Sequence, residues 1–555
     1  MFRTLIVILA VSLLLPQARA DDEQPSNPSA HVLQAEIALS RGEYLRAAQE
    51  YRKAAEAGND VEHARRATLV ADSFGFNDEA IRSAKRWLVL DENDELALGY
   101  LARLQLRTGD LRSARRNFKK LVAKGDGEPG QRILALVQAL EDEDVEDVYE
   151  LIAFLAKPYD ESANAQHAVA VTALDAGKDD VAMERAQKTI ELEPDWLRPR
   201  FVYGRALLIA GREDEAIDYI ARIIGDDPDP DPEARMELAV IMMSVGRDDD
   251  ALSQVNQVLL ERPSQASALR LMAIINFRQQ NLDAAWQDFE DLLASGQYTN
   301  DAFYYLARIA DFRENHEQAM LLYSEVTRGS RAVSAQRRAA AILAFQLENE
   351  DQALQQLDDF GRDHPAHAIE MMQSKAQLLA SLDRHQEALD LFDQLARYRP
   401  DEESVALGRA ELLLNMDRLE DAIAAYRAAA KRWPDSPTTL NALGYTLADR
   451  TDRYREAEKL IRRAIKLDPE NAAIIDSLGW VLFKRGNNAE ALVELKRAYE
   501  LFDDAEVAAH LVEVLYVMER KDEALEMLTA AESKDPDSRF LKDVRERMFP
   551  GSTDD

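Results

Sequence analysis

The chain contains no cysteine and only 21 glycines among its 555 residues. Without cysteine there are no disulfides, thiol nucleophiles, iron–sulfur clusters or zinc-thiolate sites. The scarcity of glycine and of β-branched runs points to helices. Positive charge is also in short supply, because 68 Lys and Arg residues against 102 Asp and Glu residues leave a net charge of −34. Such acidity disfavours binding to nucleic acid or anionic lipid, which both require basic surface.

What remains is typical of a large, folded, helical protein. Hydrophobic residues make up 46% of the chain, too many for a disordered acidic sequence. Length alone predicts about three to four ordinary domains. After the first twenty residues no segment approaches the roughly 18 apolar residues that a membrane span needs, so we expect no integral membrane span.

The first twenty residues have the pattern of a secretory signal peptide. A basic start is followed by an apolar run at residues 5–15, a break at Pro16 and a small-x-small cleavage pattern at residues 18–20. The run is too short for a permanent span, and the alternative interpretation is a buried first helix. We therefore predict a signal peptide at residues 1–20 and a flexible lead-in at residues 21–30. Because no cysteine follows the run, the mature protein is expected to be periplasmic and soluble rather than lipid-anchored.

The rest of the chain repeats with a period of 33 to 35 residues. One small residue recurs in each unit, and it is alanine except at the fourth position: Ala47, Ala80, Ala114, Val148, Ala182, Ala216, Ala251, Ala285, Ala319, Ala353, Ala388, Ala422, Ala457, Ala491 and Ala524. A second small residue lies about twelve positions earlier in the units from the sixth to the fourteenth: Gly204, Ala239, Ala273, Ala307, Ala341, Ala376, Ala410, Gly444 and Gly479.

Two small residues a dozen positions apart describe a helical hairpin. They let two helices approach closely, and a proline such as Pro263 or Pro469 stops the second helix. Bulky apolar residues at helical spacing fill the interface. The pattern predicts fifteen repeats over residues 31–536, with a capping helix at residues 537–549 and a tail at residues 550–555.

With these features the chain resembles the tetratricopeptide repeat (TPR) family. Repeat fourteen carries Gly479, Gly486, Ala491, Leu495 and Ala498 at the family's spacings. The resemblance implies an all-α TPR solenoid: about fifteen helix-turn-helix repeats in a right-handed superhelix, closed by a C-terminal capping helix. It also implies that the first helix of each pair lines a concave, protein-binding face.

Two repeats depart from this pattern. The degenerate fourth repeat, at residues 130–158, lacks the alanine and is either a distorted packing joint or a partner site. Repeat thirteen has one extra residue between Gly444 and Ala457, which predicts a longer turn between its helices.

A search for chemistry finds no catalytic motif. His364 and His367 form a close pair, but proline between them and the lack of a third ligand argue against a metal site. The acidic, proline-rich run at residues 226–232 has no glycine turn or bidentate glutamate, so a solvated loop is favoured over a calcium site. We predict no catalytic residue, no metal and no cofactor, and therefore no enzyme.

The inner wall of such a solenoid comes from fixed positions of the first helices. With the small residue numbered 8, position 9 reads Arg205, Val240, Ile274, Arg308, Ile342, Gln377, Glu411, Tyr445 and Trp480. Position 5 reads Phe201, Met236, Arg270, Tyr304, Arg338, Gln373, Leu407, Asn441 and Asp476. These side chains either face the hollow and bind a partner or pack on the next repeat's helix.

Tyr445 and Trp480 are the strongest candidates for a partner-binding groove, because tyrosine and tryptophan concentrate binding energy. The other candidates, chosen from the same rows, are Asn441, Asp476, Tyr304, Arg308 and Arg270. Some TPR domains clamp a C-terminal carboxylate with lysine, arginine and asparagine, and only the asparagine is present here, so that clamp is not reproduced.

Residues 441–486 resemble repeats of bacterial envelope TPR lipoproteins, including adaptors that bring substrates to a periplasmic carboxyl-terminal processing protease. The resemblance implies a non-catalytic periplasmic adaptor whose partners are that protease and its cell-wall hydrolase substrates. One alternative is a structural component of envelope or exopolysaccharide assembly. A more remote one is a hydrolase with its site between repeats.

Overall fold

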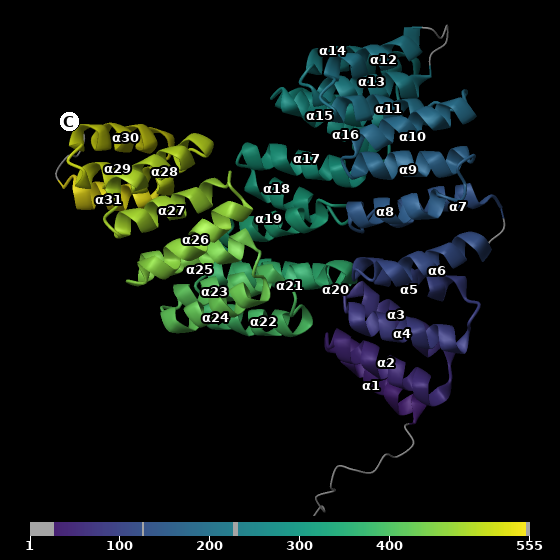
Figure 1. Cartoon of the computed structure of the whole chain (residues 1–555), viewed down its shortest axis with the longest axis horizontal. Coiled ribbons are helices and arrows are strands. Elements are labelled where there is room, and N and C mark those ends of the chain that lie inside the picture. Colours follow the sequence, from purple (N-terminus) through teal and green to yellow (C-terminus); the bar gives the residue numbers. More distant parts are fainter. Residues whose placement is uncertain (1–26, 125–126, 226–230, 551–555) are drawn as a thin grey trace, which may run out of the picture. The chain divides into compact units, whose positions relative to one another are not determined.

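The computed structural model describes residues 27–124, 127–225 and 231–550 (Figure 1). The predicted signal peptide, most of the lead-in, residues 226–230 of the acidic run and the last five residues lie outside these ranges. Within them every element is an α-helix apart from one 3-10 turn at Pro365–His367, and no β-strand occurs.

The chain divides into two compact units, which end at Asp288 and begin at Phe289. The helices of the N-terminal unit are α1 (Pro28–Ser40), α2 (Tyr44–Gly58), α3 (Val61–Ser73), α4 (Asn77–Leu90), α5 (Glu95–Arg107), α6 (Leu111–Lys124), α7 (Pro129–Ala139), α8 (Val145–Ala156), α9 (Ala163–Asp175), α10 (Asp179–Leu192), α11 (Arg198–Ile209), α12 (Glu213–Gly225), α13 (Pro232–Ser244), α14 (Asp248–Glu261) and α15 (Ala266–Arg278). The boundary falls within α16 (Leu282–Ala294).

The C-terminal unit continues the same series. Its helices are α17 (Thr299–Phe312), α18 (His316–Ser324), α19 (Ala332–Phe345), α20 (Glu350–Asp363), α21 (Ala368–Ser381), α22 (His385–Tyr398), α23 (Glu403–Asn415), α24 (Leu419–Arg432), α25 (Pro437–Arg450), α26 (Tyr454–Leu467), α27 (Ala472–Lys484), α28 (Asn488–Leu501), α29 (Ala505–Val517), α30 (Lys521–Lys534) and α31 (Arg539–Met548). Most odd-numbered helices up to α29 pair with the following even-numbered helix, and within each unit neighbouring pairs pack on one another.

The predicted all-α TPR solenoid is confirmed, and the recurring alanine explains how it packs. Every alanine of the predicted series is fully buried. At Gly479 a methyl group would lie 2.5 Å from Cγ of Leu495, and at Gly444 it would lie 2.6 Å from Cγ1 of Ile461. The two helices of a hairpin therefore approach so closely that only small residues fit at the crossing.

The fourth hairpin is built differently. Val148 replaces the recurring alanine, and Leu136 stands twelve positions before it, where other repeats have a small residue. Two bulky residues keep the helices apart, and α7 packs more extensively on α9 than on its own partner α8. The fourth hairpin therefore packs differently from its neighbours.

The prediction of a longer turn in repeat thirteen is wrong. The turn between α25 and α26 spans three residues, as does the turn between α27 and α28, whereas α25 is one residue longer than α27. The extra residue continues the helix, and Thr451 after it takes an extended conformation. The equivalent turn in repeat fourteen uses Gly486 at φ 83°, a left-handed conformation that glycine adopts without strain.

The last helix, α31, packs on α29 and α30. Its Leu541 and Val544 are buried in the same hydrophobic cluster as Leu511 and Leu515 of α29. This helix covers an apolar face that the fifteenth hairpin would otherwise leave open.

Candidate functional site

The first helices of five consecutive hairpins in the N-terminal unit, α7, α9, α11, α13 and α15, contribute residues to a common hollow. Positions 2, 5, 6 and 9 of a helix lie on one face, since they are three or four residues apart. Two adjoining pockets occupy this hollow, and His167 and Arg198 line both. We call the two pockets together the central groove.

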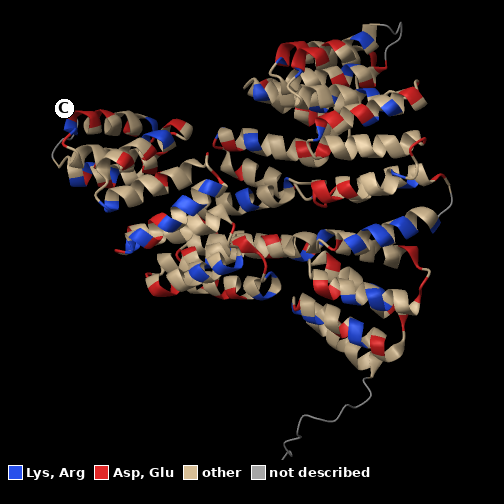
Figure 2. Ribbon diagram, in the orientation of Figure 1, with Lys and Arg blue, Asp and Glu red and all other residues tan. Residues whose placement is uncertain are grey.

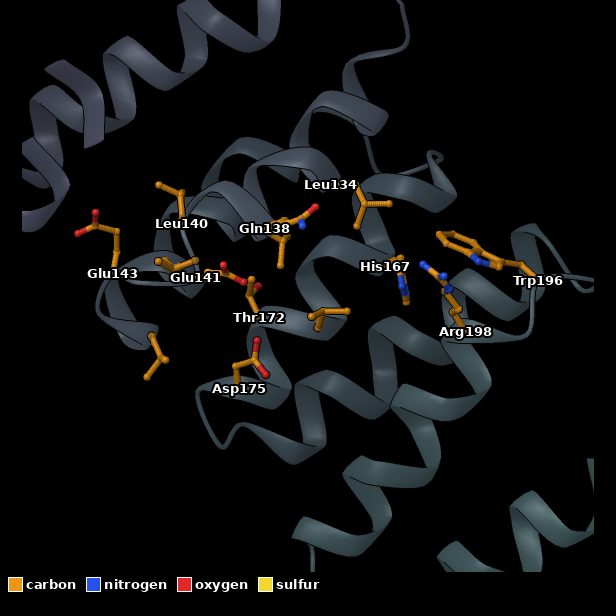
Figure 3. Close-up of a pocket in the computed structure, with 14 residues that line it drawn as sticks. Leu134, Gln138, Leu140, Glu141, Glu143, His167, Thr172, Asp175, Trp196 and Arg198 are labelled. Atoms are coloured by element: carbon orange, nitrogen blue, oxygen red, sulfur yellow. The ribbon is translucent and has the colours of Figure 1, made fainter. Parts of the chain in front are cut away.

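The first pocket of the central groove lies where α7, α8 and α9 meet the start of α11 and has a volume of about 640 Å³ (Figure 3). Its lining residues are Leu134, Val137, Gln138, Leu140, Glu141, Glu143, Val145, Val148, His167, Val171, Thr172, Asp175, Trp196 and Arg198. The pocket therefore adjoins the degenerate repeat, where bulky residues hold α7 and α8 apart.

The turn between α7 and α8 is fixed to the third repeat by a buried carboxylate. Glu143 accepts two hydrogen bonds from Arg107, at 3.0 Å from Nε and 2.5 Å from Nη2. Arg107 and Arg103 also bind the two carboxylate oxygens of Asp72, at 2.9 and 2.6 Å. Burial lowers the pKa of Arg107, but the bonds and charges of Glu143 and Asp72 outweigh it and raise that pKa. This network holds one end of the pocket in place.

At the other end of the pocket His167, Trp196 and Arg198 lie beside one another (Figure 3). The rings of His167 and Trp196 are 4.4 Å apart between centroids and inclined at 56°. Only 5% of His167 is exposed, and its Nδ1 is buried without a hydrogen-bond partner. Burial, and then the charge of Arg198, lower the pKa of His167 to about 4. The imidazole is therefore neutral near pH 7.

The second pocket, of about 460 Å³, is lined by α9, α11, α13 and α15. Five residues from the predicted inner-wall rows line it: Phe201, Arg205, Met236, Val240 and Arg270. Its other lining residues are His167, Arg198, Val202, Glu233, Glu237, Gln265, Ser267 and Leu271. The repeat phase therefore identified this part of the inner wall, although Arg270 was the only one of these residues among the named candidates.

Arg205 is already paired within this pocket. Its Nε and Nη2 donate to the two carboxylate oxygens of Glu237, at 2.5 and 2.6 Å. The hydrogen bonds that Arg205 donates to Glu237 raise the pKa of Arg205 despite its burial. Because the two residues lie on adjacent first helices, the pair ties α11 to α13 and leaves Arg205 neutralised.

The candidates in the C-terminal unit pack largely on neighbouring helices. Trp480 is only 5% exposed, and its ring stacks on His510 of the next first helix with centroids 4.1 Å apart. Nζ of Lys484 lies 4.5 Å from the centroid of the same indole. Asp476 is buried and binds Nδ1 of His510 at 2.9 Å. Of the two interpretations of position 9, packing on the next repeat describes Trp480.

Tyr445 and Asn441 lie half-buried on α25. The Tyr445 hydroxyl donates to Oε1 of Glu506 at 2.8 Å, and burial followed by the Glu506 charge raises the pKa of Tyr445. Oδ1 of Asn441 is buried without a hydrogen-bond partner. The structure thus gathers Tyr445, Asp476 and Trp480 around α29, and their role in partner binding stays a prediction.

Tyr304 and Arg308 lie together on α17. The ring of Tyr304 meets Tyr305 edge-on at 5.5 Å, and the guanidinium groups of Arg331 and Arg308 lie 5.2 and 5.9 Å from its centroid. Tyr304 is half-buried and Arg308 exposed. They form a cation–π cluster, and neither residue is among those that line the central groove.

The histidine pair near the 3-10 turn stacks on Phe360, at 4.2 Å for His364 and 6.1 Å for His367. Among the described residues no group of three or more histidines and acids is placed to hold a metal ion. The described helices also include none with the length and apolar character needed to cross a membrane.

Sequence reasoning missed His167, Trp196 and Arg198. The inner-wall rows were read only from the sixth repeat onward, although the same phase places His167 at position 5 and Val171 at position 9 of the fifth. Trp196 and Arg198 lie at a helix start, where the row pattern carries less information.

Family comparisons bear directly on the repeat. One model described as "Tetratricopeptide repeat" matches residues 13–62, 168–232, 373–437 and 441–506, and a second with the same description matches residues 207–275. Together the two models cover more than half of the chain.

Similar proteins include the TPR repeat-containing protein PA4667 of Pseudomonas aeruginosa. It is 28% identical over 483 residues, which are 87% of this chain and 81% of the relative. ER membrane protein complex subunit 2-A of Xenopus laevis is 27% identical over 137 residues, 25% of this chain and 45% of the relative.

Similar solved structures include yeast Tom70, with 14% identity and a TM-score of 0.31 over 94% of this chain and 96% of that one. A thermophilic TPR protein from Thermus thermophilus has 24% identity and a TM-score of 0.30 over 32% of this chain and 96% of that one. The repeat phase, the helical hairpins and the family models agree, and the chain belongs to the tetratricopeptide repeat family.

Proposed function

We propose that this protein is a non-catalytic scaffold that binds segments of other proteins in the central groove. TPR proteins bind other proteins and are typically non-catalytic. The observation that carries the proposal is the groove itself, in which equivalent positions of successive first helices line two adjoining pockets of about 640 and 460 Å³. Pockets of this size accept the side chains of a helix or an extended segment.

The lining supports binding to protein rather than to nucleic acid. Apolar residues such as Val137, Val171, Met236 and Val240 offer surface that a partner's side chains can bury. Glu237 neutralises Arg205, so this arginine is not available to phosphate groups.

The finer proposal is that the scaffold is exported and acts as an adaptor for a periplasmic carboxyl-terminal processing protease. The signal-peptide pattern of residues 1–20 supports export, and the resemblance of residues 441–486 to envelope adaptors supports the protease partner. In this scheme the central groove binds a cell-wall hydrolase substrate while the C-terminal repeats bind the protease.

Site-specific photocrosslinking in the native host tests the proposal. Benzoylphenylalanine replaces Val240, which lines the second pocket, and in a control replaces Val89, which is 72% exposed on α4. We expect an adduct from position 240 alone, and mass spectrometry should identify a protease or a wall hydrolase. Equal adducts at both positions, or adducts only with general chaperones, contradict the proposal.

Other adducts would favour the alternatives. Crosslinks to an outer-membrane or synthase complex would indicate a structural part of envelope or exopolysaccharide assembly. Hydrolysis of wall or peptide substrates by the purified protein without a partner would indicate an enzyme. Export is tested separately by N-terminal sequencing of protein from the periplasmic fraction, which should begin at Asp21.

A further inference from the structure

We infer that the central groove contains a carboxylate-binding site formed by His167 and Arg198. Its occupant is a segment of a partner protein that carries an aspartate or glutamate side chain flanked by apolar side chains. The inference rests on the proposed protein-binding function and names the chemistry that this groove recognises.

His167 provides the first observation. Its side chain is almost fully buried, and yet Nδ1 has no hydrogen-bond partner in the described part of the chain. Buried polar groups in folded proteins are nearly always hydrogen-bonded, so an unpartnered one at a pocket wall indicates a group that a ligand satisfies. Since the imidazole is neutral near pH 7, one of its nitrogens carries a proton that it can donate.

Arg198 provides the second observation. It is exposed at the mouth of both pockets and, among residues 27–124, 127–225 and 231–550, makes no ion pair or hydrogen bond. Arg205, which lies about two turns further along the same helix, is by contrast paired with Glu237. Lysine and arginine lie among aspartate and glutamate along the helices of both units (Figure 2).

The start of α11 adds to the positive potential. This twelve-residue helix begins at Arg198 without a side-chain cap and without an acidic residue in its first turn. The equivalent start of α13 is capped by Asp231 and carries Glu233 in its first turn. Pro199 in the first turn has no amide hydrogen, and the amides of Arg200 and Phe201 donate to the carbonyl of Leu197, so this end contributes through the helix dipole and the charge of Arg198.

The residues around His167 and Arg198 determine which other groups the ligand should carry. Leu134, Val137, Val171 and the Trp196 ring line the pocket next to the two polar groups. Of the three acids labelled in Figure 3, Glu141 and Glu143 lie at the opposite end of the pocket and Asp175 lies beside Thr172, away from Arg198. Glu143 is bound to Arg107. A carboxylate at His167 and Arg198 would accept hydrogen bonds from both, and neighbouring aliphatic side chains of the ligand would contact Trp196 and the valines.

A selection from random twelve-residue peptides displayed on phage tests this inference on the full chain. The peptides are joined to the coat protein through their C-termini, so only side chains supply carboxylates. We expect enrichment of an acid next to aliphatic residues, and at least a tenfold loss of affinity for Arg198→Gln. The matched control Arg212→Gln removes an exposed arginine paired with Glu215 outside the groove and should bind normally.

The outcomes separate this inference from the proposed function. Peptides that bind in the groove without an acid, or that bind Arg198→Gln equally well, overturn the carboxylate site and leave protein binding intact. Failure to select any peptide overturns the carboxylate site as stated, while the crosslinking experiment decides the scaffold role.

The histidine gives an independent readout. On addition of a selected peptide, nuclear magnetic resonance of the labelled imidazole should show the pKa of His167 rising from about 4 by about one unit or more, because a nearby anion favours the charged form. An unchanged pKa with peptide bound would place the carboxylate elsewhere and overturn the assignment. Circular dichroism of both arginine variants checks that the fold is retained.

Discussion

At the scale of single residues, this fold depends on the places where nothing larger than a methyl group fits. The recurring alanines are fully buried at the crossing of two helices. In three first helices the second small residue is a glycine instead of an alanine. These sites were predictable from the sequence, because each crossing recurs at a fixed phase. The stacking of Trp480 on His510 was not, because His510 stands at position 6 of the fifteenth repeat, outside the rows of positions 5 and 9.

Gly479→Ala should destabilise the C-terminal repeats by about 1–3 kcal/mol. Its new Cβ would lie 2.5 Å from Cγ and 2.7 Å from Cδ2 of Leu495, and the backbone nitrogen of that residue is 3.2 Å away. Urea unfolding measures the change. The control is Gly99→Ala on α5, where nothing lies within 4 Å and the helix should gain about 0.5–1 kcal/mol. A neutral Gly479→Ala would show that the crossing tolerates expansion.

The buried pair of His510 and Asp476 makes the stability of the C-terminal helices depend on pH. Burial lowers the pKa of His510, but the charge and hydrogen bond of Asp476, with the charges of Glu506 and Glu513, outweigh it and raise the pKa above 6.5. A raised folded-state pKa contributes stability that is fully present below about pH 6.5 and is lost as pH rises through the folded value.

Asp476→Asn should therefore cost more stability at pH 6 than at pH 9. Without the carboxylate, only burial and the more distant glutamates act on the pKa of His510, and a buried unpaired imidazolium is unfavourable. Urea unfolding at the two pH values measures the difference. An equal loss at both would show that Asp476 acts only through packing.

At the scale of helices and turns, the sequence predicted the hairpins well and their irregularities less well. The extra residue of repeat thirteen continues α25 instead of lengthening the turn, because one more residue adds a backbone hydrogen bond within the helix. In repeat four, the sequence showed that Val148 replaces the alanine, whereas the packing of α7 on α9 became visible only in the structure. The pocket beside it requires knowledge of where α9 and α11 lie, and the local pattern does not contain that.

Glu143→Gln should loosen the turn between α7 and α8. The carboxylate of Glu143 binds Arg107 through two hydrogen bonds, and removing its charge leaves Arg107 and Arg103 with Asp72 alone. Hydrogen exchange measured by mass spectrometry should show faster exchange at residues 140–147. Exchange in α17 to α31 should stay unchanged, and unchanged exchange at the turn itself would contradict the role of the network.

At the scale of the whole molecule, stability should accumulate locally. Each hairpin packs mainly on its neighbours, and the chain divides into two compact units. In such arrays total stability is approximately a sum of repeat and nearest-neighbour terms. Acids and bases are mixed along the helices of both units (Figure 2), and some form ion pairs between neighbouring hairpins, such as Arg338 of α19 with Asp311 of α17.

Trp480→Ala tests whether stability accumulates locally along the array. It also tests whether the indole of Trp480 is a packing residue or a partner-binding residue. Trp480 lies on α27 and is buried against His510 of α29, so its truncation should lower the free energy of unfolding by about 3–5 kcal/mol. Truncation of an exposed binding residue would lower it by less. Hydrogen exchange of the full chain should then show lost protection in α25 to α31 and native protection in α1 to α12. The exposed Phe312→Ala, at 72% exposure, is the matched aromatic control and should change little. Uniform loss of protection along the chain would show that the array unfolds as one cooperative unit, whereas native stability of Trp480→Ala would return the indole to the partner-binding candidates.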